Sequence, residues 1–128
     1  MTKAKRPLRP ADATIGERVR IDGPLPGESI LIRLSDGHAA GSLVTREDGA
    51  SLVVERLCIE PAFRGYGLGS DAARLVRLAA ERGPWNVLRA WAPPDLGLAI
   101  YFWCRMGLRP LHGEGPDGGL WFERDVGG

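Results

Sequence analysis

The residues whose types and spacing could do chemistry lie in one short segment, FRGYGLGSD, residues 63–71. Gly65, Gly67 and Gly69 alternate with other residues there, immediately before a helical pattern. Glycine lets the backbone turn tightly and lets a ligand approach without a Cβ in the way. A helix N-terminus presents free amides and about half a positive charge, which suits a phosphate group. We interpret the segment as a phosphate-binding turn; the alternative is a tight turn with no ligand.

The spacing excludes two common nucleotide motifs. A P-loop requires Gly-Lys-Ser/Thr, and this segment contains no lysine. A dinucleotide fingerprint requires glycine where Ser70 stands, and it would follow an early parallel strand. A nucleotide-binding module that uses the same glycines stays the less favoured alternative.

The segments before the glycines predict three antiparallel strands. Residues 29–48 read as a hairpin, in which Asp36-Gly37 supplies the positive φ angles of a tight two-residue turn. Ser51–Ile59 follows with the run SLVVERLCI, which is apolar apart from Glu55 and Arg56. Such a run predicts a central strand that is covered on both sides.

The segments after the glycines predict a helix, a strand, a second helix and two closing strands. In SDAARLVRLAAERG, residues 70–83, the apolar side chains fall on one helical face, and Gly83 suits a left-handed cap. Residues 85–91 predict a strand, and Asp95 can cap a helix that ends at Gly107. With a further short strand at residues 17–21, the order predicts an α+β or mixed α/β domain.

The composition is that of one globular domain. The 128 residues are 44% apolar and 26% charged, enough to bury about two thirds of the unfolded surface. The net charge of +1 offers no electrostatic argument for binding nucleic acid or a membrane surface. We expect a mobile basic arm at residues 1–13, a single domain at residues 14–128 and, since no signal peptide is visible, a cytoplasmic location.

The two cysteines and two histidines suggest no separate chemistry. Cys58 and Cys104 lie in apolar runs, so we expect small buried residues of a reduced protein. Neither His38 nor His112 is placed beside a cysteine, and no metal-ligand spacing exists.

A longer run around the glycines, LCIEPAFRGYGLG (Leu57–Gly69), resembles the signature of the GNAT superfamily of acyl-CoA-dependent N-acyltransferases. In that family a Pro-containing turn ends a central strand, and Arg/Gln-x-x-Gly-x-Gly/Ala opens a helix. A second segment, Ala99–Pro110, is similar to the family pattern A-x-x-x-Y-x-x-x-G-F. The resemblance covers roughly residues 28–126. It implies a mixed, mostly antiparallel sheet with helices on both faces, and transfer of an acetyl group from acetyl-CoA to a primary amine of a small molecule or protein.

The resemblance also implies which groups hold acetyl-CoA, with no metal. Backbone amides of Leu57, Cys58 and Ile59 would hold the pantetheine arm. The glycine turn would hold the pyrophosphate, and its residues are Arg64, Gly65, Tyr66, Gly67, Leu68, Gly69 and Ser70. The strand at residues 86–91 should splay from the central strand and open a slot for the thioester, where a strand amide would be the oxyanion donor.

Glu55 is the candidate general base, because carboxylates on this strand often serve that role in the family. It would collect a proton from the amine directly or through water. The alternative is a structural ion pair with Arg56 or with a cross-strand arginine such as Arg33. Glu60, at the end of the strand, is a second and weaker candidate.

The chain departs from the family pattern at the general acid. Trp103 stands four residues before Gly107, where the family commonly has a tyrosine, and tryptophan has no proton to give a thiolate. Tyr101 lies about 200° around the helix, so we assign it only a contact with the co-substrate. Asp95 stands where the family frequently has an asparagine before this helix. A catalytically weak CoA-binding regulatory domain is therefore the alternative function.

The second departure concerns the acceptor. Six residues separate Ile21 from Glu28, too few for the two helices that usually wall the acceptor site in the family. We expect these helices to be reduced or absent, and the acceptor site to be open or completed by a second subunit in a homodimer. The four tryptophans could line an acceptor pocket, but packing in a small core is the preferred interpretation.

Overall fold

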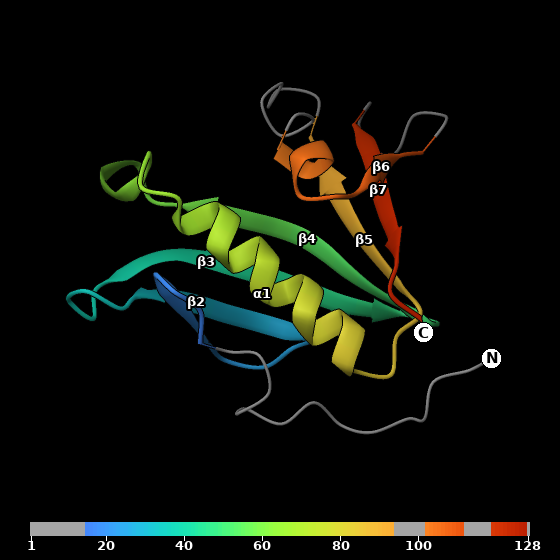
Figure 1. Cartoon of the computed structure of the whole chain (residues 1–128), viewed down its shortest axis with the longest axis horizontal. Helices are drawn as coiled ribbons and strands as arrows, with labels where there is room; N and C mark the ends of the chain where they lie inside the picture. The colour runs from blue at the N-terminus through green and yellow to red at the C-terminus, as the bar shows by residue number, and fades with distance from the viewer. Residues whose placement is uncertain (1–14, 94–101, 112–118, 128) are drawn as a thin grey trace.

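The computed structural model describes residues 15–93, 102–111 and 119–127. Seven strands form one sheet in the order β1-β2-β3-β4-β5-β7-β6 (Figure 1). The strands are β1 (Val19–Asp22), β2 (Gly27–Arg33), β3 (Ala39–Asp48), β4 (Ser51–Ile59), β5 (Val87–Ala92), β6 (Arg109–Pro110) and β7 (Leu120–Asp125). All neighbours are antiparallel except β4 and β5, which are parallel. The mixed, mostly antiparallel α+β architecture predicted from the sequence is confirmed.

The β2–β3 connection differs from its prediction. It is a loop of residues 34–38 rather than a two-residue turn. The Asp36 carboxylate accepts hydrogen bonds from Arg33 Nε and from the His38 amide, each at 3.1 Å. The bond from Arg33, and then the one from His38, holds the pKa of Asp36 well below its usual range. These contacts close a wider loop, in which Gly37 adopts a positive φ, of 74°.

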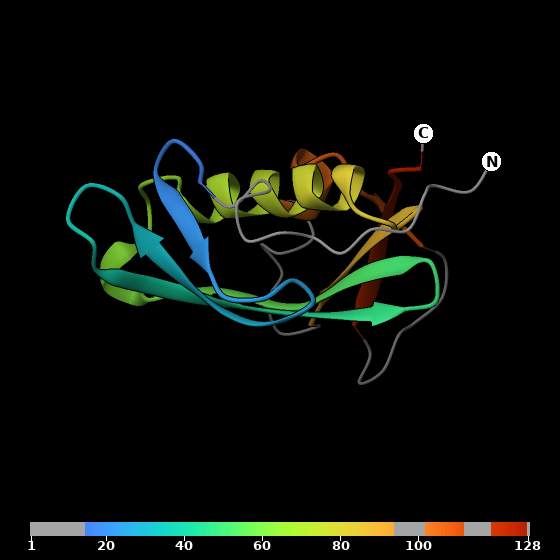
Figure 2. The same cartoon turned by 90° about the horizontal axis from the view of Figure 1, so that it is seen from below.

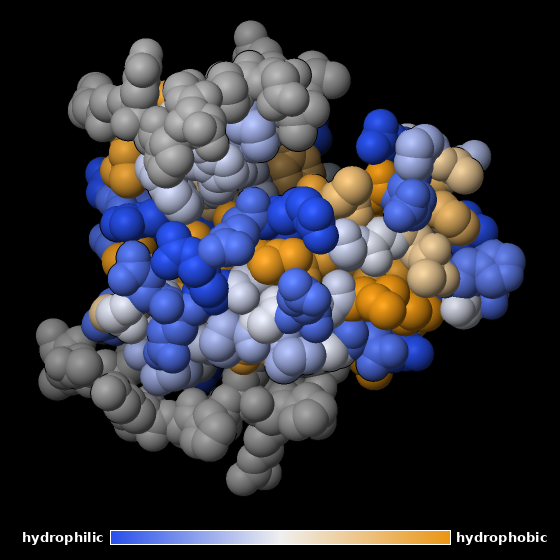
Figure 3. All heavy atoms as spheres, turned by 180° about the vertical axis from the view of Figure 1, so that it is seen from behind, coloured by the Kyte–Doolittle hydropathy of each residue, from blue (hydrophilic) through white to orange (hydrophobic). Residues whose placement is uncertain are grey.

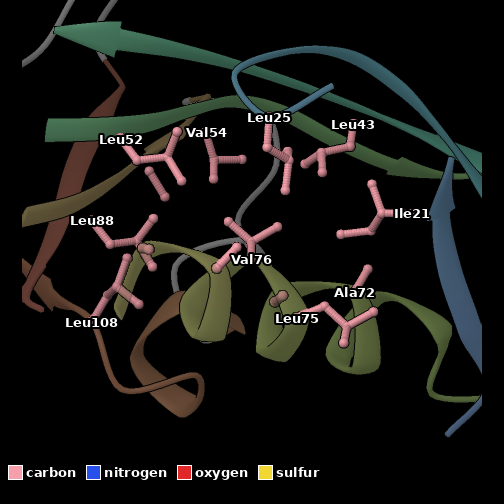
Figure 4. Close-up of a cluster of buried hydrophobic side chains, with 14 of the residues drawn as sticks. Ile21, Leu25, Leu43, Leu52, Val54, Ala72, Leu75, Val76, Leu88 and Leu108 are labelled. Atoms are coloured by element: carbon pink, nitrogen blue, oxygen red, sulfur yellow. The ribbon is translucent and has the colours of Figure 1, made fainter. Parts of the chain in front are cut away.

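Helix α1 (Leu68–Arg82) forms the core with one face of the sheet. The apolar face predicted from the sequence is buried, and the helix begins at Leu68, two residues earlier than predicted. Figure 4 shows this face packed against strand side chains, among them Leu43, Leu52 and Leu88. Each fully buried leucine contributes about 1.5–3 kcal/mol relative to an exposed one, so this contact holds the helix on the sheet.

Gly83 follows α1 for a reason other than the predicted left-handed cap. Its φ and ψ angles are −84° and −171°, which is extended backbone. A Cβ on Gly83 would lie 2.4 Å from Cζ3 of Trp85. Trp85 is 2% exposed, and its Nε1 donates a hydrogen bond to Glu47 at 3.2 Å. The glycine therefore makes room for a buried indole ring.

The described helices lie on one face of the sheet only. Residues 102–105 are helical and lie beside α1 (Figure 2), and Trp103 joins the same core. Within the described residues no helix covers the opposite face, so the expected helices on both faces are not found there. The β1–β2 connection is only residues 23–26, too short for a helix, which agrees with the expected reduction of the N-terminal helices.

The uncovered face, which we call the open face, is seen in Figure 3 with hydrophobic residues between hydrophilic ones. Because no described helix covers it, Glu55, Arg56 and Cys58 of β4 are exposed. The expectation that β4 is covered on both sides is therefore wrong for this end of the strand. Cys104 is exposed as well, so the prediction of two buried cysteines is also wrong. No described helix is long and apolar enough to span a membrane.

A buried carboxylate ties β1 to α1. Asp71, 7% exposed, accepts hydrogen bonds from the amides of Arg18 (2.9 Å) and Val19 (3.0 Å) and from Arg74 Nη2 (2.8 Å). Burial raises the pKa of Asp71, but the bonds from Arg74 and from the amides of Arg18, Val19 and Glu17 together outweigh it and lower the pKa below its ordinary value of 3.8. The ionised carboxylate therefore stabilises the native state.

We expect Asp71→Asn to lower the free energy of unfolding by about 2–3 kcal/mol at pH 7, because an amide cannot replace a carboxylate that accepts from several donors. The folded pKa lies below the unfolded one, so the Asp71 contribution is complete above pH 4–5 and is lost as pH falls through the folded pKa. Urea unfolding between pH 3 and 7 measures the loss of unfolding free energy and its dependence on pH. Asp22→Asn, at an exposed ion pair with Arg20, is the control. An equal loss in both variants would contradict the assignment.

Candidate functional site

A wedge opens between β4 and β5. The two strands pair in parallel only over Ser51–Val54 and Val87–Ala90. Beyond these residues β4 continues to Ile59 and β5 to Ala92, and Figure 1 shows them diverging. The splay expected from the sequence is present, and Leu57, Cys58 and Ile59 lie along its β4 side. Within the described residues, no strand pairs with the β5-facing edge of this part of β4.

A β-bulge in β4 lies where the pairing with β5 stops. Thr45 of β3 pairs with Val54, whereas Val44 pairs with Arg56, so Glu55 is the extra residue. A bulge bends its strand and increases the local twist. The bulge therefore gives a physical reason for the divergence of β4 from β5.

Glu55 points to the open face, because Val54 beside it belongs to the core. Its carboxylate forms an ion pair with Arg46 Nε at 2.5 Å, and both side chains are 44% exposed. The partner is a cross-strand arginine, as the alternative interpretation expected, but it is neither Arg56 nor Arg33. Arg46 lies opposite Val53, and the bulge brings Glu55 beside it.

The glycine turn leads from β4 into α1 through a short 3₁₀ helix, Pro61–Phe63. Gly65 and Gly67 have φ angles of 88° and 76°, which side chains with a Cβ rarely adopt. The first helical hydrogen bond runs from the Asp71 amide to the Gly67 carbonyl at 3.1 Å, and no side chain caps the helix. The amides of residues 68–70 precede that bond, so they have no acceptor within the helix.

The space around the turn is compatible with a phosphate group. A Cβ built on Gly65 meets no atom within 4 Å, so the backbone is open on that side. Tyr66 is 61% exposed. Arg64 turns back and donates from Nε to the Ile59 carbonyl at 2.9 Å, so its side chain ties the turn to the end of β4.

Arg18 also lies at this turn, although no motif in the sequence points to it. Its Nη1 donates a hydrogen bond to the Tyr66 carbonyl, and a Cβ on Gly67 would lie 2.5 Å from the same nitrogen. The guanidinium group therefore lies against the glycine turn, and Asp71 holds the backbone of Arg18 in place. No local pattern in the sequence signals this contact, because 48 residues separate its partners.

The remaining predicted residues are spread over different environments. Trp103 is 5% exposed in the core, so the residue at the family's tyrosine position is a packing residue here. Glu60 is exposed at the start of the 3₁₀ turn. Tyr101, Asp95 and His112 lie outside the described residues. In the part of the chain that is described, no group of three or more His, Cys, Asp or Glu residues could hold a metal ion.

No family model matches the sequence, and neither does any curated protein sequence. Many solved structures match the fold. One is a GNAT-family acetyltransferase from Bacillus anthracis, with a TM-score of 0.66 and 13% identity over 77% of this chain and 66% of that chain. Another is the ribosomal-protein-S18-alanine N-acetyltransferase from Escherichia coli, with a TM-score of 0.65 and 14% identity over 91% of this chain and 74% of that chain.

A third solved structure is a GNAT-family acetyltransferase from Elizabethkingia anophelis with acetyl-CoA bound. Its TM-score is 0.62, with 12% identity over 77% of this chain and 76% of that chain. The chain spans about two thirds of the length of the Bacillus protein. Together with the splayed β4 and β5, these similarities show that the chain has the fold of the GNAT-family acetyltransferases.

Proposed function

We propose that this chain is a GNAT-type N-acetyltransferase that moves an acetyl group from acetyl-CoA to a primary amine. The observation that carries the proposal is the position of the glycine turn. The turn opens α1 at the end of β4, directly beside the wedge between β4 and β5. A seat for phosphates and a slot for an extended thioester arm therefore adjoin each other.

The described residues suit both the pyrophosphate and the pantetheine arm of acetyl-CoA. The amides of residues 68–70 and the Arg18 guanidinium would hold the pyrophosphate, because free helix amides and arginine both favour anions. The free edge of Leu57–Ile59 would bind the pantetheine amides as an added strand does. When bound, acetyl-CoA supplies an acetyl group that is activated as a thioester.

Glu55 would act as the base of the reaction. The amine must be neutral to attack, and the Glu55 carboxylate lies on the open face where the wedge begins, in position to accept the proton directly or through water. Arg46 would orient this carboxylate through their ion pair. We assign no general acid, since Trp103 is buried and has no acidic proton. The low basicity of a thiolate allows it to leave unassisted.

The acceptor would approach from the open face. Without helices between β1 and β2, that face admits a large acceptor such as a protein tail, whereas a second subunit could complete a site for a small amine. A monomer in sedimentation at micromolar concentration would exclude the second arrangement. We also propose that the protein acts in the cytoplasm.

We expect acetyl-CoA and CoA to raise the thermal unfolding midpoint, and ATP and NAD to leave it unchanged. A ligand at 100 times its Kd adds about 2.7 kcal/mol to folding stability, several degrees for a domain of this size. No shift with millimolar CoA ligands would overturn the proposal, and an equal or larger shift with NAD would favour a nucleotide-binding module. Binding without turnover of any amine would favour a regulatory CoA-binding domain.

Gly67→Ala should reduce the acetyl-CoA shift strongly, because the new Cβ displaces Arg18 and strains the turn. Gly49→Ala is the matched control. Gly49 also has a positive φ, of 56°, but a Cβ there meets no atom within 4 Å and the residue lies in the β3–β4 turn. Both variants should lose about 1–2 kcal/mol of stability from backbone strain, yet only the first should lose ligand binding.

Arg18→Ala should weaken acetyl-CoA binding about 3- to 10-fold, as expected for one charge-assisted contact with phosphate. The affinity should also depend less on salt in this variant. Isothermal calorimetry at two salt concentrations measures both effects. The control is Arg20→Ala in β1, two residues further along the chain, since Arg20 pairs with Asp22 instead of the turn. Equal affinities for all three proteins would remove Arg18 from the site.

Glu55→Gln should lower kcat about 100-fold or more, because general base catalysis typically contributes that much. The KM for acetyl-CoA should change little, since Glu55 lies outside the glycine turn. Glu28→Gln, at an exposed position of β2, is the control. Release of free CoA thiol across a panel of amines reports the rate. Unchanged kcat in the Glu55 variant would leave this residue with a structural ion pair only.

A further inference from the structure

Two of the four tryptophans lie outside the core. Trp85 and Trp103 are 2% and 5% exposed and pack in the core. Trp91 of β5 and Trp121 of β7 are partly exposed and stand opposite each other across the strand pair. Their ring centroids are 5.1 Å apart, with 52° between the ring planes. The two rings thus form one continuous aromatic surface, which we call the indole pair.

The indole pair lies on the open face. Ala90 and Ala92, on either side of Trp91, belong to the core. Since side chains alternate along a strand, Trp91 points to the opposite face. Its cross-strand neighbour Trp121 lies on the same face, because residues directly opposite each other share a face.

The register places Trp91 and Glu55 one residue beyond the same strand pair. Val54 and Ala90 are the last residues that pair between β4 and β5. Glu55 is the next residue on β4, Trp91 is the next on β5, and both point to the open face. The Glu55 carboxylate and the Trp91 indole therefore lie on the same face at the two sides of the wedge, the face from which the proposed function has the acceptor approach.

The backbone at Gly119 lies close against the Trp91 ring. A Cβ on Gly119 would lie 2.5 Å from Cη2 and from Cζ2 of Trp91, so only glycine leaves room for the ring. A ring packed between the Gly119 backbone and Trp121 has less conformational freedom to lose on ligand binding than a fully exposed side chain has.

We propose that the indole pair binds an aromatic group of the acceptor, and that the acceptor is an arylalkyl primary amine. The inference rests on the proposed function. An aromatic ring on the indole pair would place an amine at the end of a short alkyl chain near the wedge. The amine nitrogen forms a bond to the acetyl carbon as the carbon–sulfur bond breaks. The Glu55 carboxylate takes the amine proton, and CoA leaves as the thiolate.

The alternative is that the indole pair only stabilises the pairing of β5 and β7. A purely structural pair would lower stability when it is mutated, and it would change the kinetics of all amines alike. A binding surface would change KM for aromatic amines alone. The two roles are therefore separated by a comparison of substrates rather than by loss of activity.

The test measures kcat and KM for 2-phenylethylamine and propylamine at saturating acetyl-CoA. We expect wild type to prefer 2-phenylethylamine, and Trp91→Leu to raise KM for this amine about 5- to 10-fold with little change in kcat. Propylamine kinetics should be unchanged, and Trp91→Phe should retain most of the preference. Ile30→Ala, at an exposed apolar residue of β2, is the control that should behave as wild type. Thermal unfolding checks that each variant is folded.

Each outcome bears on one claim. Turnover of both amines without an aromatic preference, or an equal loss for both in Trp91→Leu, would overturn the indole-pair inference and leave the acetyltransferase proposal intact. Turnover of no amine would count against the acetyltransferase proposal. In that case calorimetry of 2-phenylethylamine with the CoA-bound protein still tests the inference. Weaker binding to Trp91→Leu than to wild type would support it, and equal binding or none to wild type would overturn it.

Discussion

The loss of pairing between β4 and β5 after Val54 is the constraint on which the site depends. One extra residue in β4, Glu55, changes the register with β3 and turns the strand away from β5. The same bulge points the Glu55 carboxylate to the open face and brings it beside Arg46. A single irregularity in the sheet thus accounts for both the wedge and the position of the Glu55 carboxylate at its mouth.

The hydrophobic core lies on one face of the sheet, and it holds the diverging strands without covering the open face. Helix α1 and Trp103 cover the same side of the sheet, and Asp71 joins the start of β1 to the helix through backbone hydrogen bonds. This anchor also places Arg18 against the glycine turn. Asp71 therefore serves stability directly, and it would serve the proposed phosphate binding as well, because it positions the backbone of Arg18.

The open face follows from the short β1–β2 connection. Four residues, 23–26, join the two strands, and no described helix covers Glu55 or the indole pair. A partly exposed aromatic surface on the same face as a carboxylate suits a substrate that is apolar at one end and carries an amine at the other. The face that lacks a cover is thus the face where an acceptor could be recognised.

Local patterns in the sequence determined the strands, the buried face of α1 and the glycine turn, because each depends on periodicity or on backbone freedom within a few residues. The resemblance of Leu57–Gly69 to the GNAT signature implied the fold, and it made Glu55 the candidate base. Tertiary structure alone decided the Arg46 partner of Glu55, the contact of Arg18 with the turn, the extended Gly83 beside Trp85, and which two tryptophans leave the core. These features join residues that are distant in sequence, or depend on which face of the sheet is covered. Sequence periodicity cannot show them, because it reports only whether a residue is buried and not what buries it.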